Sequence, residues 1–421
     1  MNILFTLRNI ACKGGSERVV INLANELCKI PDYKISIVSY YTDTKANNPY
    51  SYWLDSRVNV SYLYNHDEVR KKGISKIIWR LTKPLIVNLL INKKYKGYDI
   101  IIESDFAFFY PRFRERESKN TKYIKIMHSI IKKWKSKNNL FDCIVFLNEK
   151  ELLKWQSYSK NVIKIPNFIT SQPYIDLLPK AINFLKELPN KNEILQAALE
   201  NYCQDTNIDL PYKDIQKFKQ ARYILKTFIN HTLNTNIESK LYKLIAVGRM
   251  DAINNHKGFP RLIQAYSKIA HKFPQWQLEI IGQDQGQRKL LESQIDSLKM
   301  QNYITLKPFT TNIESIYLQA DIFVMSSHIE SLPMVLIEAE SFGLPIVAYD
   351  IGTIQDCFDN NGILVKDNDE SEFCLAMEAL MNDEYKRLNL GWNSIKLARN
   401  KFQKEKIIKQ WLELFKTITS N

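Results

Sequence analysis

Residues 244–281, LIAVGRMDAINNHKGFPRLIQAYSKIAHKFPQWQLEII, read as a strand, a loop, a helix and a second strand. Leu244–Val247 and Leu278–Ile281 are short apolar runs of the kind that form buried strands, whereas Phe259–His271 repeats its apolar residues at helical spacing. A helix between two such strands is typical of a parallel sheet whose faces are covered by helices. We therefore predict a doubly wound α/β unit around this stretch.

The same alternation of strands and helices extends in both directions along the chain. Further strands are predicted in the second half at Ile304–Leu306, Ile322–Met325 and Ile346–Ala348, with helices near Asn312–Gln319 and Pro333–Phe342 and over most of Glu370 to Phe415. The first half contains the predicted helix Ser16–Lys29 and the predicted strands Ile3–Leu7, Ile35–Tyr40, Asp99–Ile102, Tyr123–Met127, Cys143–Leu147 and Val162–Ile165. Two such units place ligands at the carboxyl ends of their strands, so we predict two Rossmann-like domains facing each other across a cleft.

The length of 421 residues supports two domains, because single cores stop growing below this size. We predict an N-terminal domain over residues 1–168, completed by a C-terminal helix at about 403–421, and a C-terminal domain over 241–402. Between them, Ser171 to Ser239 has no strand pattern and repeats its apolar residues at helical spacing. Residues 169–240 are therefore predicted to be a helical insertion.

The net charge of +14 is concentrated in one region of the chain. Residues 69–137 contain 19 basic and five acidic side chains, which accounts for the whole excess. A one-sided basic patch indicates an anionic partner, which would be a membrane, a nucleic acid or a polyanionic glycan; a merely solvated surface is the alternative.

Within this basic region, Ile74–Leu81 is amphipathic. Its apolar residues share one face, whereas Lys76, Arg80 and Lys83 share the other. The apolar residues are Ile74, Ile77, Ile78 and Leu81. They would either enter a membrane interface or pack on the N-terminal sheet.

Several classes of protein are disfavoured by the sequence. The apolar N-terminus turns polar after a few residues and is typical of a first strand, not of a signal peptide. The longest apolar stretch, Pro84 to Ile91, is far too short to span a bilayer. Six scattered cysteines without a CxxC pair are typical of reduced thiols in a cytosolic protein, so we expect neither a disulfide framework nor a metal site.

The strongest chemical signal is ESLPMVLIE at residues 330–338. Glu330 lies in the loop after a predicted strand, and Glu338 lies one to two turns into the next helix, which has Pro333 at its first turn. The free N–H groups and the dipole of a helix start favour a phosphate or a polarised sugar hydroxyl. The deeper carboxylate suits the two hydroxyls of a ribose. Two glutamates at this spacing alone are more often solvated side chains.

Cations and glycines elsewhere strengthen this interpretation. Gly248 and Arg249 end a predicted strand, and Lys257 opens the following helix, so that Arg249 and Lys257 are placed to converge on a diphosphate. Gly14 and Gly15 form a loop between the first strand and the first helix, where a phosphate is readily held. This loop is not a GxGxxG fingerprint, which disfavours an NAD site.

Together these elements resemble the retaining, GT-B-fold glycosyltransferases of family 4, the glycosyl transferases group 1. The resemblance is dense over residues 247–365 and thin in the N-terminal half. Its motifs are Gly14 to Val19, Ile165-Pro166-Asn167, Val247-Gly248-Arg249, Lys257-Gly258-Phe259, Leu278 to Gly282, Ala320 to Val324, Ser327 to Ala339, Gly343 to Ala348 and Asn361 to Val365.

The resemblance implies a role for each matching residue. Arg249 and Lys257 would bind the donor diphosphate and stabilise the leaving group, and Glu338 would hold the ribose. Glu330 would touch the transferred sugar, and His128, which follows a predicted strand, would contact the same sugar. The implied catalytic residues are Glu330, Arg249, Lys257 and His128. The implied donor-binding residues are Gly14, Gly15, Gly248, Ser331, Leu332, Pro333, Met334, Val335 and Glu338.

The family also implies a reaction and a location. A sugar would move with retention from a nucleotide-sugar, expected to be a UDP-sugar, to a glycan or lipid-linked glycan in the synthesis of a cell-surface polysaccharide such as capsule or lipopolysaccharide. No Asp-x-Asp motif stands where a donor metal would bind, so we expect neither a metal nor another cofactor. The basic patch then places the enzyme at the cytoplasmic face of an anionic membrane, with the acceptor on the N-terminal domain.

Four departures from the family pattern are visible. Ser331 replaces the usual glycine, and the glycine-rich donor turn of the family appears as Ile351-Gly352-Thr353-Ile354. Asp251–Asn255 lengthens the loop before Lys257, and residues 171–239 exceed the short family linker. Three other functions stay open at this stage: a nucleic-acid-binding protein that uses the basic patch, an inactive partner subunit of the same fold, and an epimerase or phosphorylase. Nucleic acid is the less expected partner, because the patch lacks the interleaved aromatic residues of a strand-binding platform.

Overall fold

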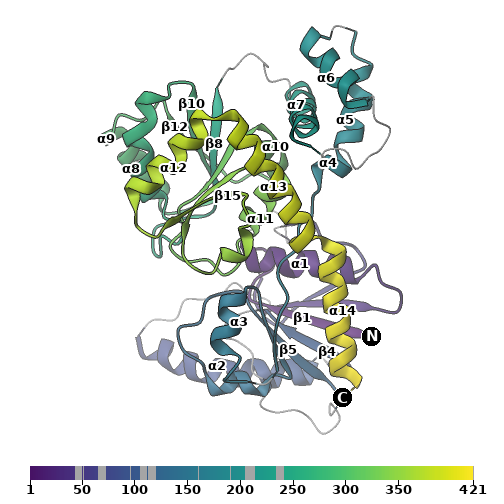
Figure 1. Cartoon of the computed structure of the whole chain (residues 1–421). Helices are drawn as coiled ribbons and strands as arrows, with labels where there is room; N and C mark the ends of the chain where they lie inside the picture. Colours follow the sequence, from purple (N-terminus) through teal and green to yellow (C-terminus); the bar gives the residue numbers. More distant parts are fainter. Residues whose placement is uncertain are drawn as a thin grey trace. The chain divides into compact units, whose positions relative to one another are not determined.

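The computed structural model describes residues 1–42, 50, 52–64, 73–94, 96–104, 111, 120–159, 161–189, 191–203, 214–233 and 241–420. The chain forms two compact units (Figure 1). The first comprises Met1–Asn167 together with Lys404–Asn421, and the second comprises Phe168–Gln403. Each unit is built on its own parallel sheet, which confirms the predicted α/β class with two Rossmann-like sheets.

The first unit contains a seven-stranded sheet with the order β3-β2-β1-β4-β5-β6-β7. All of its pairs are parallel. Because β1 lies in the middle, the chain first winds to one side of it and then crosses to the other between β3 and β4. The strands are β1 (Asn2–Leu7), β2 (Lys34–Ser39), β3 (Asn59–Tyr62), β4 (Ile100–Glu103), β5 (Lys122–Met127), β6 (Cys143–Phe146) and β7 (Val162–Lys164).

Helices complete the core of this first unit. Helix α1 (Gly15–Leu27) packs on β1 and β2, and the C-terminal helix α14 (Lys404–Ser420) packs against α1. Val87 of α2 (Gly73–Lys94) and Trp155 of α3 (Glu149–Trp155) belong to one buried cluster with sheet residues such as Leu4. A single 3-10 turn, η2 (Ser136–Leu140), lies between β5 and β6.

The second unit contains a six-stranded parallel sheet with the order β12-β10-β8-β13-β14-β15. A pair of two-residue strands, β9 (Met250–Asp251) and β11 (Asp284–Gln285), forms a small separate sheet beside it. The sequence pattern did not predict β3, β9, β11 or β15. The main strands are β8 (Tyr242–Val247), β10 (Trp276–Ile281), β12 (Ile304–Lys307), β13 (Ile322–Met325), β14 (Ile346–Asp350) and β15 (Gly362–Lys366).

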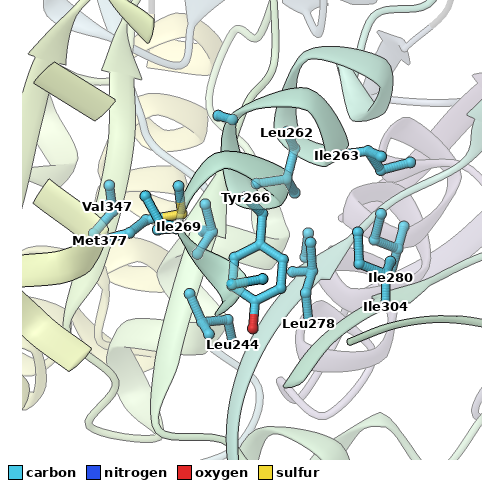
Figure 2. Close-up of a cluster of buried hydrophobic side chains, with 14 of the residues drawn as sticks. Leu244, Leu262, Ile263, Tyr266, Ile269, Leu278, Ile280, Ile304, Val347 and Met377 are labelled. Carbon is cyan, nitrogen blue, oxygen red and sulfur yellow. The ribbon is translucent and has the colours of Figure 1, made fainter. Parts of the chain in front are cut away.

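One face of this sheet forms a large hydrophobic core. Helices α8 (Phe259–Ile269), α9 (Arg288–Ser297) and α12 (Glu370–Asn382) bury their apolar sides there. Figure 2 shows the ring of Tyr266 among aliphatic side chains that include Leu244 and Leu278. The Tyr266 hydroxyl donates a hydrogen bond of 3.1 Å to the carbonyl of Trp276, so its polar group is satisfied inside the core.

The other helices of the second unit include those of the predicted insertion. Besides α10 (Ile313–Gln319), α11 (Met334–Ser341) and α13 (Glu384–Phe402), they are α4 (Pro173–Asp176), α5 (Leu178–Lys186), α6 (Glu193–Cys203) and α7 (Ile215–Thr232), with the turns η4 (Ala270–Lys272) and η5 (Gln355–Cys357). Helix α7 packs on α10 and α13. Lys226 of α7 pairs with Asp321 at 2.5 Å, and the hydroxyl of Tyr174 donates to the carbonyl of Phe342 at the end of α11.

No described helix is both long enough and apolar enough to cross a membrane.

Candidate active site

The second unit has its topological switch point between β8 and β13. The chain leaves β8 toward β10 and β12 on one side, whereas β13 to β15 continue the sheet on the other. Ligands of doubly wound sheets bind at the carboxyl ends of the strands that flank such a point. Gly248 and Arg249 follow β8 directly, and Ser326 begins the loop that follows β13. The sequence-predicted residues of this unit therefore lie at or near the switch point.

Lys257 is held close to the end of β8 by two glycines. A Cβ atom on Gly248 would lie 2.6 Å from Cε of Lys257, so any other residue there would displace the lysine stem from its present path. Gly258 adopts a left-handed conformation with φ of 63°, and a Cβ there would lie 2.1 Å from the carbonyl oxygen of Ser326. The absence of a side chain at Gly248 thus lets the Lys257 stem lie against the end of β8, and its absence at Gly258 lets the backbone lie against Ser326.

Glu330 is the ion-pair partner of Lys257. The Lys257 Nζ atom lies 2.7 Å from Oε1 of Glu330, and the Ser327 hydroxyl donates to the same oxygen at 2.9 Å. Thr353, in the turn after β14, donates to the backbone carbonyl of Glu330 at 2.5 Å. Both charged side chains are largely buried, since 20% of Lys257 and 14% of Glu330 is exposed. Such a pair is weakly screened by salt.

Further hydrogen bonds join the loop of Lys257 to the loop of Glu330. The Ser326 hydroxyl donates to the carbonyl of Lys257 at 2.9 Å, and the N–H of His328 donates to the carbonyl of His256 at 2.7 Å. Arg261 donates to the carbonyls of Ser326 and Ser327 at 2.7 and 2.6 Å. The two loops therefore form one rigid element.

The sequence analysis did not identify Arg261. The guanidinium group also pairs with Asp367 at 2.8 Å and lies 4.1 Å from the centre of the Tyr349 ring. In a sequence, an Arg in a helix next to a lysine motif is usually a surface charge. The contact of Arg261 with the loop after β13 cannot be predicted from the sequence, because that loop lies 65 residues later in the chain.

Helix α11 brings the remaining acidic residue to this edge. Pro333 caps the helix and accepts from the N–H of Leu336, whereas the N–H groups of Met334 and Val335, at the very start, have no partner within the helix. Glu338 lies one turn further on and is 4% exposed. The hydroxyl of Tyr317 lies 3.1 Å from Oε2 of Glu338 and is placed to donate to it. A carboxylate held in this way keeps a defined orientation, as a ribose ligand requires.

The other predicted donor-binding residues differ in exposure. Arg249 is exposed, so its guanidinium group is accessible to a ligand. Ser331, Leu332, Pro333 and Met334 are buried, and Val335 is half-buried. The loop Asp251–Asn255, longer than the family pattern, is held in place because Asp251 belongs to β9 and accepts hydrogen bonds from the N–H groups of Ile253 and Asn254.

Three predicted residues lie in the first unit, at the carboxyl edge of its sheet. Gly14 caps α1 just before Gly15, and a Cβ on Gly15 would meet no atom within 4 Å. His128 follows β5, and its Nε2 is buried with no hydrogen-bond partner in the described structure. Burial lowers the pKa of His128 to about 4, so the imidazole is neutral at pH 7. A neutral histidine with an unsatisfied nitrogen is suited to hydrogen-bond a sugar hydroxyl.

Glu103 is a further polar residue that the sequence analysis treated only as a charge. It ends β4, directly beside Thr6 of β1, and its side chain is fully buried. The hydroxyls of Tyr40 and Thr6 donate to its Oε2 at 2.6 and 2.7 Å. Because β1 and β4 flank the switch point of this sheet, the network lies where a ligand of the first unit is expected. The sequence does contain one sign of this role, because Glu103 is an acidic residue at the end of an apolar strand.

The two Rossmann-like units and the charged residues at the switch point of the second match the GT-B fold of glycosyltransferases. The family match and the relatives below agree that the protein is a glycosyltransferase. Residues 232–397 match the model of the family described as glycosyl transferases group 1. This stretch includes every candidate residue of the second unit.

Comparison with known proteins gives relatives of the same class. An uncharacterized glycosyltransferase of Haemophilus influenzae is 26% identical over 97% of this chain and 98% of its own length. A poly(glycerol-phosphate) alpha-glucosyltransferase of Bacillus subtilis is also 26% identical, but over 53% of this chain and 35% of its own length. Among solved structures, the Anabaena protein HepE in complex with UDP and glucose superposes with a TM-score of 0.67 at 15% identity, covering 99% of this chain and all of that one. This last likeness concerns the fold alone.

Proposed function

We propose that this enzyme is a retaining glycosyltransferase of family 4. It transfers a hexose from a UDP-sugar to a glycan or lipid-linked glycan during the synthesis of a cell-surface polysaccharide. The choice of UDP is supported by the HepE complex, and the name of the Bacillus relative supports a polymer as acceptor, although the polymer it names is poly(glycerol-phosphate) and not a glycan. That name also specifies an alpha-glucosyl product, which is the retained configuration when the donor is an α-linked nucleotide-sugar.

The observation that carries this proposal is the buried pair of Lys257 and Glu330 at the switch point. A donor diphosphate brings two negative charges to a lysine that a single carboxylate now neutralises. We propose that the diphosphate takes over Lys257 and that Glu330, still held by Ser327, turns to the hydroxyls of the sugar. Phosphate oxygens pair well with lysine as a point charge, and the exposed fork of Arg249 adds a second contact.

The remaining residues position the other parts of the donor. The N-terminus of α11 directs unpaired N–H groups and its positive dipole end toward a bound anion. Glu338, oriented by Tyr317, binds the ribose hydroxyls. In the first unit, we assign the loop of Gly14 and Gly15 and the neutral imidazole of His128 to substrate binding, because they lie at the carboxyl edge of the sheet of that unit.

The proposed reaction is a front-side displacement. The bond from the anomeric carbon to the diphosphate oxygen breaks, and the acceptor hydroxyl oxygen bonds to the same face of that carbon. The proton of the hydroxyl passes to the departing phosphate oxygen, so no protein base is required. Lys257, Arg249 and the start of α11 stabilise the charge that develops on the leaving group, which is the main catalytic contribution of preorganised dipoles and cations.

We propose that the reaction proceeds without a divalent metal. Two cations and the N-terminus of a helix together supply the positive charge that a metal supplies elsewhere. Among the described residues, no cluster of three or more His, Cys, Asp or Glu side chains has the geometry of a metal site.

The stereochemistry of the product tests the proposal. The enzyme is incubated with an α-linked UDP-sugar and an acceptor oligosaccharide, and the anomeric proton of the product is examined by NMR. An α-linked product supports retention. A β-linked product would overturn the mechanism, and the formation of an epimerised nucleotide-sugar without transfer would favour the epimerase alternative.

The location is part of the same proposal. An enzyme that uses cytoplasmic nucleotide-sugars and a lipid-linked acceptor works at the inner face of the membrane, to which we assign it as a peripheral protein. The net positive charge of residues 69–137 suits that surface.

A further inference from the structure

Helix α2 presents an apolar stripe to solvent. Ile74 and Leu81 are 77% and 75% exposed, the highest values among its large apolar side chains. The stripe comprises Ile74, Ile77, Ile78, Leu81, Leu85 and Leu89. Successive positions are three or four residues apart, except that Ile77 and Ile78 are adjacent, so all six share one side of the helix over about four turns. We call this set the α2 stripe.

A different side of the same helix packs on the protein. Val87 and Ile91 are completely buried in the cluster that includes Leu4 and Ile101 of the sheet. At 100° per residue, Val87 and Ile91 are turned from the centre of the α2 stripe by roughly 150° and 110°. The sequence left two roles open for Ile74 to Leu81, and the structure excludes one of them, because these exposed residues do not pack on the N-terminal sheet.

The part of the chain that contains the α2 stripe is basic. From Val69 to Gly97 the chain has nine basic residues and no acidic one. Lys93 of α2 and Lys132 and Lys133 of the segment after β5 are exposed. That segment lies on the same face of the sheet as α2, because Ile131 belongs to the same buried cluster as Val87. The side chains of Lys76, Arg80 and Lys83 lie outside the described residues.

We infer that the α2 stripe inserts into the interfacial region of an anionic lipid bilayer. Exposing a row of Ile and Leu side chains to water costs free energy, and a helix with a long apolar side beside clustered Lys and Arg is the kind that lies in a membrane interface. An apolar protein partner would bury the α2 stripe but would not neutralise the cations. A soluble polyanion would neutralise the cations but would leave the stripe exposed to water. An anionic bilayer supplies both hydrocarbon and negative charge.

This inference deepens the proposed function, on which its biological sense rests, by naming the element that brings the enzyme to a lipid-linked acceptor. Insertion of the α2 stripe and simple electrostatic adsorption of the basic residues predict different dependences on salt and on the apolar side chains. Adsorption alone depends on charge and disappears with salt, because charges are screened within a Debye length of about 10 Å at 0.1 M salt. Insertion adds an apolar contribution that depends on the side chains of the stripe.

Co-sedimentation of the full-length protein with vesicles tests the inference. The vesicles contain either phosphatidylcholine alone or equal parts of phosphatidylcholine and phosphatidylglycerol. We expect binding to the anionic vesicles only, weaker at high salt. The triple variant Ile74→Ser, Ile78→Ser, Leu81→Ser should lower the partition coefficient at least tenfold, although every charge is retained. A second variant, with Lys71, Lys72, Lys76 and Arg80 changed to Gln, should also bind less.

A matched control uses three apolar residues of similar exposure in the second unit. The variant Ile194→Ser, Leu290→Ser, Leu375→Ser removes the same kind of surface elsewhere and should bind vesicles like the wild type. The inference is overturned if the stripe variant binds like the wild type, if neutral vesicles bind equally well, or if the wild type does not bind at low salt.

A second measurement keeps the two proposals apart. Hydrolysis of the nucleotide-sugar without acceptor, measured in the absence of vesicles, should be the same in the stripe variant and the wild type, which also shows that the variant folds. If vesicle binding behaves as expected but no nucleotide-sugar is turned over, the proposed function fails and the docking surface stands. If turnover is normal and vesicle binding is absent, the docking surface fails and the proposed function stands.

Discussion

Gly248 and Lys257 form a complementary pair in which the absence of one side chain makes room for the other. A Cβ on Gly248 would lie between 2.6 and 2.8 Å from Cγ, Cδ and Cε of Lys257, well inside van der Waals contact. The lysine stem therefore crosses directly over the end of β8 before its ammonium group reaches Glu330. The position of the ammonium group depends on this glycine, although Gly248 has no side chain of its own.

The variant Gly248→Ala should displace Lys257 and lower kcat/KM at least tenfold, equivalent to about 1.4 kcal/mol of transition-state stabilisation. The fold should tolerate the change, because the atoms that must move belong to a flexible side chain. Steady-state kinetics of Gly248→Ala, Lys257→Ala and the double variant provide the measurement. If Gly248 acts through Lys257, the double variant is no worse than Lys257→Ala alone. Additive losses would show that Gly248 acts in another way.

The Glu103 network of the first unit should matter for stability and for the acceptor. Tyr40→Phe leaves a fully buried carboxylate with one hydrogen-bond donor fewer, and losing a hydrogen bond to a charged group costs about 1.5–3 kcal/mol. We expect a lower free energy of unfolding and a higher KM for the acceptor, with unchanged hydrolysis of the donor.

The control for Tyr40→Phe is Tyr266→Phe in the second unit, whose hydroxyl bonds only a neutral carbonyl. It should cost about 1 kcal/mol in urea unfolding and leave the acceptor KM unaffected. Equal losses of stability in the two variants, or impaired donor hydrolysis in Tyr40→Phe, would contradict this account of Glu103.

The parts of the fold that the sequence predicts are those with a local signal. Strands such as Leu244–Val247 are apolar runs next to a periodic helix, so the parallel sheets could be inferred. The two-residue strands β9 and β11 could not, because their pairing depends on tertiary contact between residues 34 positions apart in the chain. Arg261 and Tyr40 were missed for the same reason, since each is defined by partners distant in the chain.

The candidate site shows the same limit. The motif at residues 330–338 predicts both glutamates, since it lies between a strand and a helix. No periodicity shows that Lys257 and Glu330 are in contact, because they are 73 residues apart and meet only through the parallel order of β8 and β13. Likewise, the pattern of Ile74–Leu81 predicts an amphipathic helix but not which side is buried, because helical spacing alone does not identify the neighbours of a helix.

His128 should make the stability of the enzyme depend on pH. Its pKa is about 4 in the folded protein against about 6.5 in an unfolded chain. As the pH falls from about 6.5 to about 4, the unfolded chain gains a proton that the folded chain does not, so the free energy of unfolding falls. Relative to His128→Asn, the wild type should lose about 1–2 kcal/mol between pH 7 and about pH 5. The free energies of unfolding of the two proteins are measured by urea titration at several pH values. The same pH dependence in both would contradict a buried, neutral His128.

Transfer should not require a divalent metal. Lys257, Arg249 and the start of α11 supply the charge that the diphosphate requires, so activity should survive treatment with EDTA. The assay compares initial rates before and after chelation and after dialysis against metal-free buffer. A complete loss that manganese or magnesium restores would show that the cations and the helix are insufficient.

The most direct test of the central claim is acceptor-free hydrolysis measured over a panel of nucleotide-sugars, because it reports only on the donor site of the second unit. The wild type should hydrolyse one nucleotide-sugar, expected to be a UDP-sugar, well above the others. Lys257→Ala and Glu338→Ala should each lower that rate at least tenfold, or by about 1.4 kcal/mol or more, whereas the exposed controls Lys289→Ala and Glu314→Ala should not. Near-normal hydrolysis by both folded site variants, or turnover of none of the nucleotide-sugars by the wild type, would contradict the assignment of this edge of the sheet as the donor site.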